Sequence, residues 1–290
     1  MIIVTGATGQ LGSLIVNKLM DRVPADRIGV SVRDPQKAAD LEARGVRVRQ
    51  GDFGDADSLR HAFEGATQIL LVSSNARASG GDPLAQHRNA IDAAKAVGAK
   101  RIVYTSQMAA SATSDFPPAR DHAVTEAMLA KSGLAWTALR HGFYAESGMM
   151  INNYGLTTGT IEAPADGKVS WTTRADLAEA DAIILADEGR FDGATPPLTA
   201  AEAINLEEFA AIASDVLGRP VSRKVLSDEE FRAKMAARGA PEGALTMALG
   251  LYVAARNGEF ATVDPTLETL LGRRPTDMRM LIAEKNAYGA

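Results

Sequence analysis

Three glycines, Gly6, Gly9 and Gly12, stand three residues apart directly after an apolar run over residues 2–4. Apolar residues at helical spacing follow, so the segment predicts a strand, a tight turn and a helix. Gly6 would permit the turn, Gly9 would let the backbone approach a pyrophosphate, and Gly12 would let the helix pack closely. The pattern therefore predicts a dinucleotide site, with packing of the turn alone as the alternative. The free amides and dipole of the helix start would face the phosphates, and the expected contacts are Gly6, Ala7, Thr8, Gly9, Gln10 and Leu11.

Two polar positions further along predict how the rest of a dinucleotide is held. An acidic residue usually follows the second strand of such domains and accepts from the ribose hydroxyls. Here that position holds Arg33, whose guanidinium suits the 2′-phosphate of NADP, while Asp34 follows it and leaves NAD open. Asp52 and Phe53 close the third expected strand, where the carboxylate can accept from the adenine amino group and the ring can lie along the base. Capping of a turn is the alternative role for Asp52.

These residues need a sheet to position them, and the first half of the chain has the pattern of one. Apolar runs alternate with helix-length segments up to about residue 145, which predicts an α/β fold with a doubly wound parallel sheet of the Rossmann type. The expected strands are residues 2–4, 27–33, 46–50, 68–74, 101–106 and 136–140. Ligands collect beyond the carboxyl ends of such strands. Further cofactor contacts are therefore expected at Val72, Ser73, Ser74, Thr105, Ser106, Arg140, His141 and Gly142.

Beyond Tyr144 the rhythm of the sequence changes. Residues 152–167 are rich in Gly, Asn, Thr and Pro and predict an irregular segment over the cofactor. Helices are expected at residues 174–185, 206–217 and 228–237, and a short strand at residues 220–226. We therefore expect an NAD(P)-binding Rossmann domain over residues 1–150. A smaller α/β lobe over residues 151–290 would pack on it as one wall of a substrate cleft.

Composition excludes several classes of function. The chain of 290 residues has a formal net charge of −5 and no block rich in lysine or arginine, which argues against nucleic-acid binding. It has no cysteine, so disulfides, thiolate metal sites and cysteine nucleophiles are excluded. No apolar stretch is long enough to span a membrane, and no His, Asp or Glu cluster has metal-ligand spacing. A protein without a metal is therefore expected. The apolar N-terminus is typical of a core strand and not of a signal peptide, so a cytoplasmic location is expected as well.

Together these motifs resemble the atypical short-chain dehydrogenase/reductases of the NmrA-like group. Within that group the chain is most similar to bacterial NADPH:quinone oxidoreductases of type 2 and triphenylmethane-dye reductases. The resemblance covers nearly the whole chain and rests on the segments TGATGQLG (5–12), SVRDP (31–35), GDF (51–53), QHRN (86–89), YTS (104–106) and LRHGFY (139–144). It implies a flavin-free reductase that prefers NADPH to NADH and reduces quinones or similar planar, conjugated acceptors. The chain departs from the group at His141, where the family carries Asn, and at Phe143, where it carries a bulkier aromatic residue.

One feature of the wider superfamily is missing from this chain. Typical members pair a tyrosine with a lysine four residues later to move a proton, and no tyrosine here has a lysine at that spacing. On the corresponding helix the lysine position falls on His122 and the tyrosine position on Pro118. Alcohol chemistry is disfavoured because it needs a proton donor. Quinone reduction is less demanding, because a hydroquinone oxygen is a weak base and the positioning of two rings can supply most of the catalysis.

The expected catalytic residues are therefore His122, Tyr144 and His141. His122 would contact the nicotinamide ribose or protonate the product, and Tyr144 and Phe143 would stack on a flat acceptor held against the nicotinamide. Core packing is the alternative for both rings, and lining of the cleft wall is the alternative for His141.

Two other functions stay open at this point. One is a redox sensor of the NmrA-like type that binds NADP or NAD without turnover. The other is a sugar-nucleotide epimerase or dehydratase, which the missing tyrosine–lysine pair disfavours. Alanine-rich helices also leave a homodimer possible.

Overall fold

In the computed structural model, which describes residues 1–288, the chain passes repeatedly between two units. Unit 1 comprises Met1–Ser106, Asp121–Arg140 and Leu177–Pro196. Unit 2 comprises Gln107–Arg120, His141–Asp176 and the chain from Pro197 on. Each unit is built from several separate segments of the sequence. The expected roles, cofactor binding by one domain and substrate binding by a smaller lobe, stay predictions.

Unit 1 is built on a parallel sheet. Within residues 1–288, seven of its strands run in the order β10-β6-β5-β4-β1-β2-β3. β1 lies between β2 and β4, parallel to both, so the strand order reverses beside β1, which is the switch point of a doubly wound sheet. The predicted fold class is confirmed. The strands are β1 (Ile2–Thr5), β2 (Ile28–Val32), β3 (Arg47–Gln50), β4 (Gln68–Leu71), β5 (Arg101–Gln107), β6 (Ala135–His141) and β10 (Gly193–Ala194).

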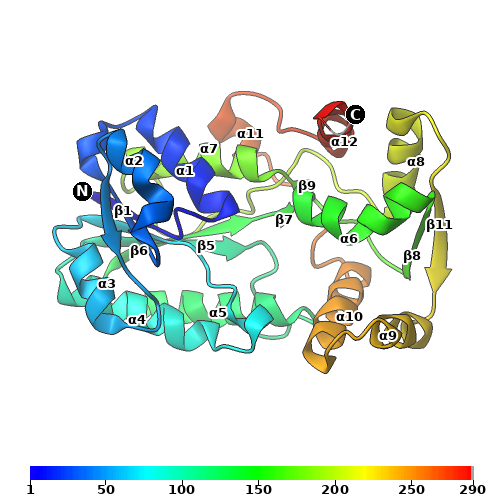
Figure 1. Cartoon of the computed structure of the whole chain (residues 1–290), viewed down its shortest axis with the longest axis horizontal. Helices are drawn as coiled ribbons and strands as arrows, with labels where there is room; N and C mark the ends of the chain where they lie inside the picture. The colour runs from blue at the N-terminus through cyan, green and yellow to red at the C-terminus, as the bar shows by residue number, and fades with distance from the viewer. Residues whose placement is uncertain (289–290) are drawn as a thin grey trace. The chain divides into compact units, whose positions relative to one another are not determined.

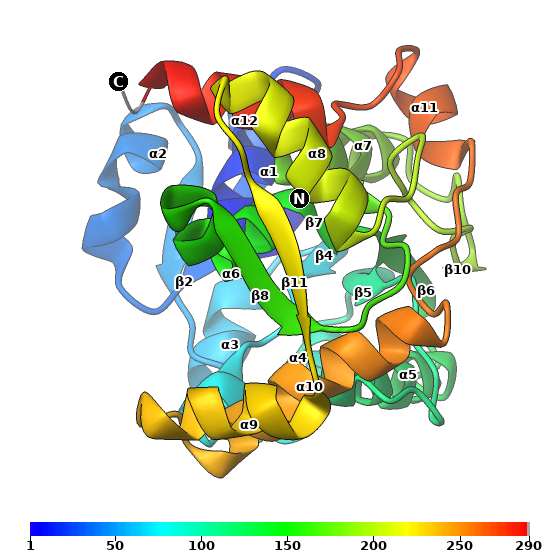
Figure 2. The same ribbon diagram turned by 90° about the vertical axis from the view of Figure 1, so that its right-hand side faces the viewer.

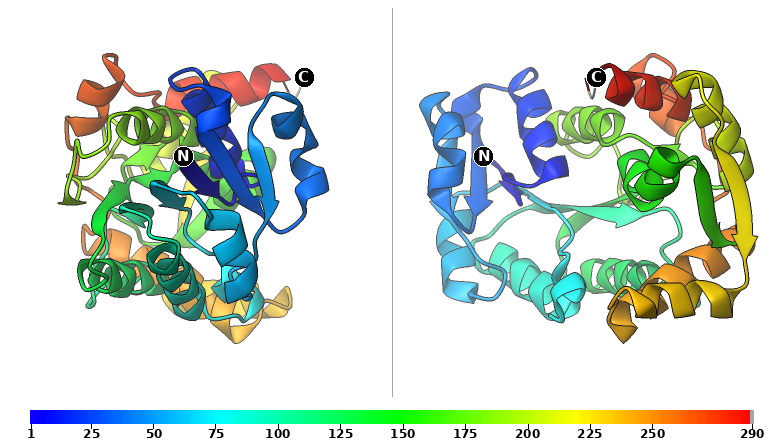
Figure 3. Two further views of the ribbon diagram at one scale, coloured as in Figure 1. Left: turned by 90° about the vertical axis from the view of Figure 1, so that its left-hand side faces the viewer. Right: turned by 45° about the vertical axis from the view of Figure 1, so that its right-hand side comes forward.

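Helices cover both faces of this sheet. Figure 1 shows α1 and α7 on one face and α3, α4 and α5 on the other, and the right-hand view of Figure 3 agrees. The α-helices are α1 (Gln10–Met20), α2 (Ala39–Ala43), α3 (Ala56–Phe63), α4 (Pro83–Ala96), α5 (Pro117–Ala130) and α7 (Arg174–Ala186). Short 3₁₀ turns lie at η1 (Ala25–Arg27), η2 (Pro35–Ala38) and η3 (Ala76–Ser79).

Burial on both faces explains the continuous apolar runs. β1, β2 and β4 are buried along their whole length, as strands covered on two sides must be. Phe63 of α3 and Tyr104 of β5 are fully buried in the same core. The six strands predicted from the sequence are observed close to their expected ends. β10 was not predicted, because two residues are too short to show a periodic pattern.

Unit 2 contains two small parallel sheets and the remaining helices. The strands are β7 (Phe143–Tyr144) paired with β9 (Trp171–Thr172), and β8 (Thr160–Pro164) paired with β11 (Ser222–Leu226). Figure 2 shows β8 and β11 with α8 and α12 toward one end and α9 and α10 toward the other. The helices are α6 (Ala145–Thr158), α8 (Leu206–Leu217), α9 (Asp228–Ala237), α10 (Glu242–Arg256), α11 (Thr266–Leu271) and α12 (Met278–Tyr288). Phe209 and Phe260 are fully buried in the core of this unit.

The expectation of an irregular segment over residues 152–167 was wrong. Most of it is the second half of α6 and the strand β8. The glycines and asparagine that suggested a loop serve helix packing instead: a Cβ on Gly155 would lie 2.7 Å from Ile161 Cα, so glycine lets α6 approach β8. Asn152 is buried and its side chain donates to the Gly148 carbonyl over 2.9 Å. Gly159, with a φ of +86°, ends the helix.

The helices and strand predicted around residues 174–237 are observed as α7, α8, α9 and β11. No helix of the described chain is long and apolar enough to cross a membrane.

Candidate functional site

The turn between β1 and α1 has the geometry of a phosphate cradle. Gly6 has a φ of +63°, a left-handed conformation that glycine adopts without strain. A Cβ on Gly12 would lie 2.3 Å from the Gly6 carbonyl oxygen, so only glycine fits where α1 meets the turn. No side chain among residues 1–288 caps the start of α1, and its first turn holds no acidic residue. The amides at this helix start suit an anion, and the cradle fits a dinucleotide pyrophosphate.

Two threonine hydroxyls fix the strand ends beside this turn. Thr5 Oγ1 donates to the Leu70 carbonyl over 3.1 Å and accepts from the Val72 amide over 2.9 Å. The Thr105 hydroxyl accepts from the Ser73 amide over 2.8 Å. The amides of Val72 and Ser73 thus donate inside the protein. The cofactor contacts predicted for them would have to come from side chains or carbonyl oxygens.

Ser74, the third residue after β4, is held by a buried histidine. Its amide donates to His87 Nε2 over 2.9 Å, and His87 Nδ1 lies 2.8 Å from the Thr125 hydroxyl. Because that hydroxyl donates to the Asp121 carbonyl, Nδ1 of His87 carries the proton and the ring is neutral. Burial lowers the pKa of His87 to about 4. This histidine therefore stabilises the loop after β4 in its uncharged form.

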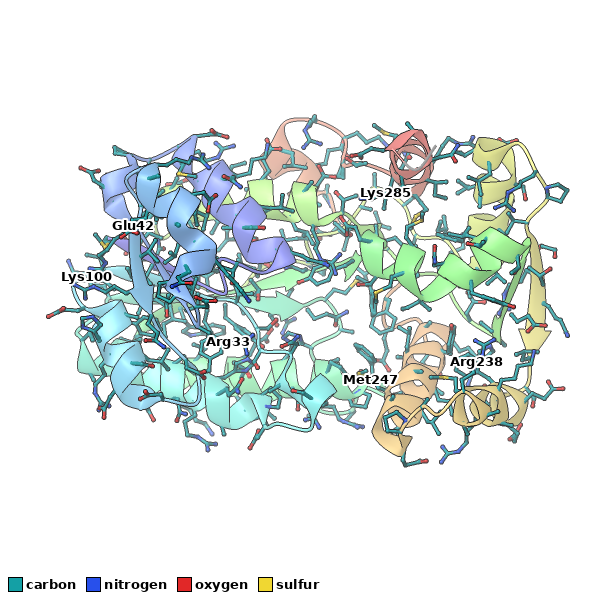
Figure 4. All side chains as sticks on the ribbon, viewed as in Figure 1. Arg33, Glu42, Lys100, Arg238, Met247 and Lys285 are labelled. Atoms are coloured by element: carbon teal, nitrogen blue, oxygen red, sulfur yellow. The ribbon has the colours of Figure 1, made fainter. Side chains whose placement is uncertain are left out.

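An exposed cation, Arg33, stands just beyond β2. The side chain of Arg33, labelled in Figure 4, is exposed and makes no hydrogen bond or ion pair with any residue between 1 and 288. The carboxylate of Asp34, by contrast, accepts from the Gln36 amide over 3.1 Å and lies 4.0 Å from Lys37 Nζ. The position expected to meet the ribose therefore offers an available guanidinium beside an occupied carboxylate, which favours a 2′-phosphate.

Asp52 takes the turn-capping role that the sequence left open. Its Oδ1 accepts from the Gly54 amide over 2.7 Å, and its amide donates to the Ser58 hydroxyl over 2.9 Å. Asn89 donates to the Phe53 carbonyl over 2.8 Å and so ties this corner to α4. Contacts of Asp52 and Phe53 with an adenine stay predictions.

The predicted residues at the ends of β5 and β6 converge on one glutamate. Glu126 Oε1 accepts from the Ser106 hydroxyl over 2.7 Å. Arg140 grips the same carboxylate, with Nε 3.1 Å from Oε1 and Nη2 2.7 Å from Oε2. Hydrogen bonding to Glu126 raises the pKa of Arg140. The cluster holds α5 to the sheet by charge-assisted hydrogen bonds, and a cofactor contact by either predicted residue stays a prediction.

The fold gives Tyr104 a basic partner that the search for a lysine four residues later could not find. The phenol oxygen of Tyr104 lies 2.7 Å from Nδ1 of His122, which belongs to α5. Tyr104 is fully buried, and the ring of His87 meets it edge-on with 5.3 Å between ring centres. This contact orients the partly exposed His122. A test of fixed spacing misses the pair because the two residues come from different elements.

Two other predicted residues, His141 and Tyr144, lie in unit 2. The ring of His141 is buried, and its centre lies 6.3 Å from that of Tyr144. The guanidinium of Arg174 lies 4.3 Å from the centre of the Tyr144 ring, a cation–π contact, and pairs with Glu146 over 3.1 Å. Gly142 has no room for a side chain, because a Cβ would lie 2.2 Å from a threonine hydroxyl. The sequence pattern gave no indication of Arg174.

Phe143 combines core packing with a place in the wall of a cavity. Its ring centre lies 5.2 Å from that of Phe260 and 5.3 Å from that of Trp171, both edge-on. The cavity lies within unit 2 and has a volume of about 520 Å³, which is in the range of small-molecule sites, about 300–1,000 Å³. Its apolar wall includes Phe116, Phe143, Met150, Ile151, Tyr154, Leu226, Phe231, Met235, Met247, Leu251 and Tyr252.

Comparison with known proteins agrees with the cradle in unit 1. A profile of the family described as NAD(P)H-binding matches residues 6–188. Quinone oxidoreductase 2 of Escherichia coli is 39% identical over 279 residues, which cover 96% of each chain. An NmrA-like family domain-containing oxidoreductase of Aspergillus flavus is 31% identical over 283 residues, which cover 96% of this chain and 92% of its own. The chain belongs to the NAD(P)H-binding, NmrA-like family.

Solved structures of family members have the same fold. The NADPH-dependent quinone oxidoreductase of Escherichia coli in complex with NADPH matches with a TM-score of 0.92 and 38% identity, over 99% of this chain and 100% of that one. The triphenylmethane reductase of Citrobacter sp. in complex with NADP(H) matches with a TM-score of 0.87 and 32% identity, over 98% and 99%. The resemblance predicted from the sequence motifs is confirmed, and the chain is an NAD(P)H-dependent oxidoreductase by family.

Proposed function

We propose that the protein transfers hydride from NADPH to quinones or similar conjugated aromatic acceptors, without a flavin or a metal. The observation that carries the proposal is the uncapped glycine cradle of α1 together with Arg33, which makes no ion pair in the described part of the chain. Quinone oxidoreductase 2 and triphenylmethane reductase, both similar to this chain along nearly their whole length, support the acceptor class.

The cofactor would be held by residues of unit 1. Gly6, Gly9 and the amides that begin α1 would bind the pyrophosphate, because no side chain competes for them in the described chain. Arg33 would bind the 2′-phosphate through paired charge-assisted hydrogen bonds. NADPH, when bound, supplies a hydride at C4 of its nicotinamide ring.

His122 is proposed to contact the nicotinamide ribose and to serve the proton that completes acceptor reduction. Its Nδ1 is engaged by the phenol of Tyr104 over 2.7 Å, so the ring is held in one orientation. An imidazole is a side chain that can give or take a proton near neutral pH. Tyr104 acts through His122 and is therefore a positioning residue.

The acceptor is proposed to bind unit 2 through its apolar cavity. Flat aromatic molecules suit a wall of methionine and aromatic side chains, since methionine adapts to their shape and aromatic rings stack on them. Phe143 lines this cavity. Roles of Tyr144 and His141 near the reacting ring stay proposals, as do a cytoplasmic location and a homodimer.

Steady-state oxidation of NADPH by the purified protein tests this function, with a benzoquinone and a naphthoquinone as acceptors and a protein-free control. Turnover well above the uncatalysed rate is the expected result. Tight binding of NADPH without turnover on any quinone would overturn the proposal and favour the NmrA-like redox sensor. Conversion of a sugar nucleotide, detected by analysis of the product because these reactions leave no net change in the cofactor, would favour the epimerase or dehydratase alternative.

A further inference from the structure

The cavity of unit 2 is apolar over most of its wall but carries an unbalanced charge at one side. Three methionines, Met150, Met235 and Met247, line it together with aromatic side chains. The acidic and basic side chains that reach it are Glu162, Lys234 and Arg238. Two tyrosines, Tyr154 and Tyr252, also line it, and Tyr252 is buried and keeps its proton because burial raises its pKa to about 12. The charges of these groups decide which polar substituent a ligand can bring into the cavity.

The carboxylate of this wall is already neutralised. Glu162 accepts a hydrogen bond from Lys224 over 3.1 Å and a second, short one from Lys234. The two lysines lower the pKa of Glu162 through these hydrogen bonds, so the carboxylate stays ionised at neutral pH. Its negative charge is balanced by the two lysines. Lys234 is thus the cation of an internal pair, and it has little attraction left for a ligand.

Arg238, which directly follows α9, differs from Lys234 in its surroundings. Its guanidinium lies 5.3 Å from the centre of the Tyr154 ring, and within residues 1–288 it makes no ion pair with any carboxylate. Figure 4 labels Arg238 and, on α10, Met247. A guanidinium that lies over an aromatic ring keeps its N–H groups, which point outward in the guanidinium plane, available for an anion. The cavity therefore joins an apolar body to a single available cation.

We propose that this cavity selects flat apolar acceptors that carry an anionic group, such as a sulfonate or carboxylate, and that Arg238 binds the anion. The inference deepens, and rests on, the proposed reductase function. Charge complementarity carries it: the wall offers an uncompensated positive charge, and its negative charge is held by two lysines.

Paired acceptors of one ring system test the proposal kinetically. The neutral acceptor is 2-methyl-1,4-naphthoquinone and the anionic one is 1,4-naphthoquinone-2-sulfonate. Arg238→Gln should lower kcat/KM for the sulfonate by about two- to fivefold at low ionic strength and leave the neutral acceptor unchanged, since that is the upper part of the range for an exposed ion pair. Added salt should shrink the difference. Arg232→Gln is the matched control, because Arg232 is an exposed arginine on α9, close in sequence to Arg238, pairs with Glu242 and does not line the cavity.

Binding without turnover separates this inference from the proposed function. Naphthalene-2-sulfonate and the neutral naphthalene-2-methanol are titrated calorimetrically into the protein without NADPH. The sulfonate should bind more tightly to the wild type, and only the sulfonate should lose affinity in Arg238→Gln. Ala244→Trp, which fills the cavity, should abolish binding of both compounds, whereas Ala237→Trp, on an exposed position outside the wall, should not.

The outcomes then point to one idea or the other. Absence of turnover with intact, Arg238-dependent binding of the sulfonate would overturn the reductase function and keep the anion site. Turnover with equal losses for both naphthoquinones in Arg238→Gln, or with none, would overturn the anion site and keep the reductase function. Unchanged sulfonate binding in Ala244→Trp would show that the compound binds outside this cavity and would also overturn the inference.

Discussion

Replacement of Arg33 by alanine should convert a preference for NADPH into near indifference between NADPH and NADH. The guanidinium is exposed, stands directly after β2 and has no partner within the described chain, so no internal ion pair is lost with it. Asp34, next to it, already caps the following turn. The substitution should therefore act on the cofactor and not on folding.

The size of the effect follows from the hydrogen bonds that would be lost. A guanidinium that grips a phosphate makes two charge-assisted hydrogen bonds. We take about 2 kcal/mol for the two together, which is the range for one hydrogen bond to a charged group, because solvent screens both at this exposed position. That loss corresponds to a fall in NADPH affinity of about 30-fold. NADH lacks the 2′-phosphate, so its affinity should change by less than about twofold.

Equilibrium titration of both cofactors, followed by nicotinamide fluorescence, measures this directly. Lys37→Ala is the control, because it removes a nearby exposed cation that pairs with Asp34. Equal losses of NADPH and NADH affinity in Arg33→Ala, or no loss of either, would refute the assignment of Arg33 to the 2′-phosphate. An equal loss of NADPH affinity in Lys37→Ala would show that any nearby positive charge attracts the cofactor and that Arg33 has no specific contact with the 2′-phosphate.

Three further predictions concern unit 1. Gly12→Ala should abolish NADPH binding and destabilise the fold by about 1–3 kcal/mol, because its Cβ would lie 2.3 Å from the Gly6 carbonyl oxygen; titration and thermal unfolding measure both. Tyr104→Phe should shift the pH profile of kcat with little change in the KM for NADPH, because His122 loses the hydrogen bond at 2.7 Å. The free energy of unfolding should fall by about 2 kcal/mol between pH 7 and pH 5 because of His87. In the unfolded chain its ring takes up a proton below about pH 6.5, whereas burial in the folded protein lowers its pKa to about 4. Protonation therefore stabilises the unfolded chain over this pH range. Urea unfolding of wild type and His87→Asn at both pH values isolates that loss.

Each of these has a clear contrary result. Normal NADPH binding by Gly12→Ala would show that the turn accommodates a methyl group and is not a tight cradle. An unchanged pH profile in Tyr104→Phe would leave Tyr104 with a packing role alone. An identical pH dependence of unfolding in wild type and His87→Asn would place the acid-sensitive group elsewhere in the chain.

The parts of this protein that could be predicted are those with a local signal. The cradle is encoded in the consecutive residues 5–12, and the strands β1, β2, β4, β5 and β6 of the main sheet each contain a short apolar run. The available cation at Arg33 could be predicted as well, because it depends only on the residue type at the end of β2. Buried parallel strands and glycine turns show their roles in their own sequence.

The parts that could not be predicted depend on contacts between distant segments. Tyr104 and His122 are joined only when α5 packs on β5, and the partner of Arg140 is a glutamate from the same helix. Residues 152–158 have the composition of a loop, yet they are helical because Gly155 lets α6 pack against β8. In each case tertiary packing decided what local propensity left undetermined.

The central claim is that NADPH bound to this protein passes its hydride to a quinone without a flavin. A single-turnover experiment tests it most directly: flavin-free protein, as judged from its visible spectrum, is loaded with an equimolar amount of NADPH and mixed anaerobically with benzoquinone. The account predicts one hydroquinone and one NADP⁺ per bound NADPH, formed at least as fast as steady-state turnover. Bound NADPH that stays reduced in the presence of excess quinone would contradict it.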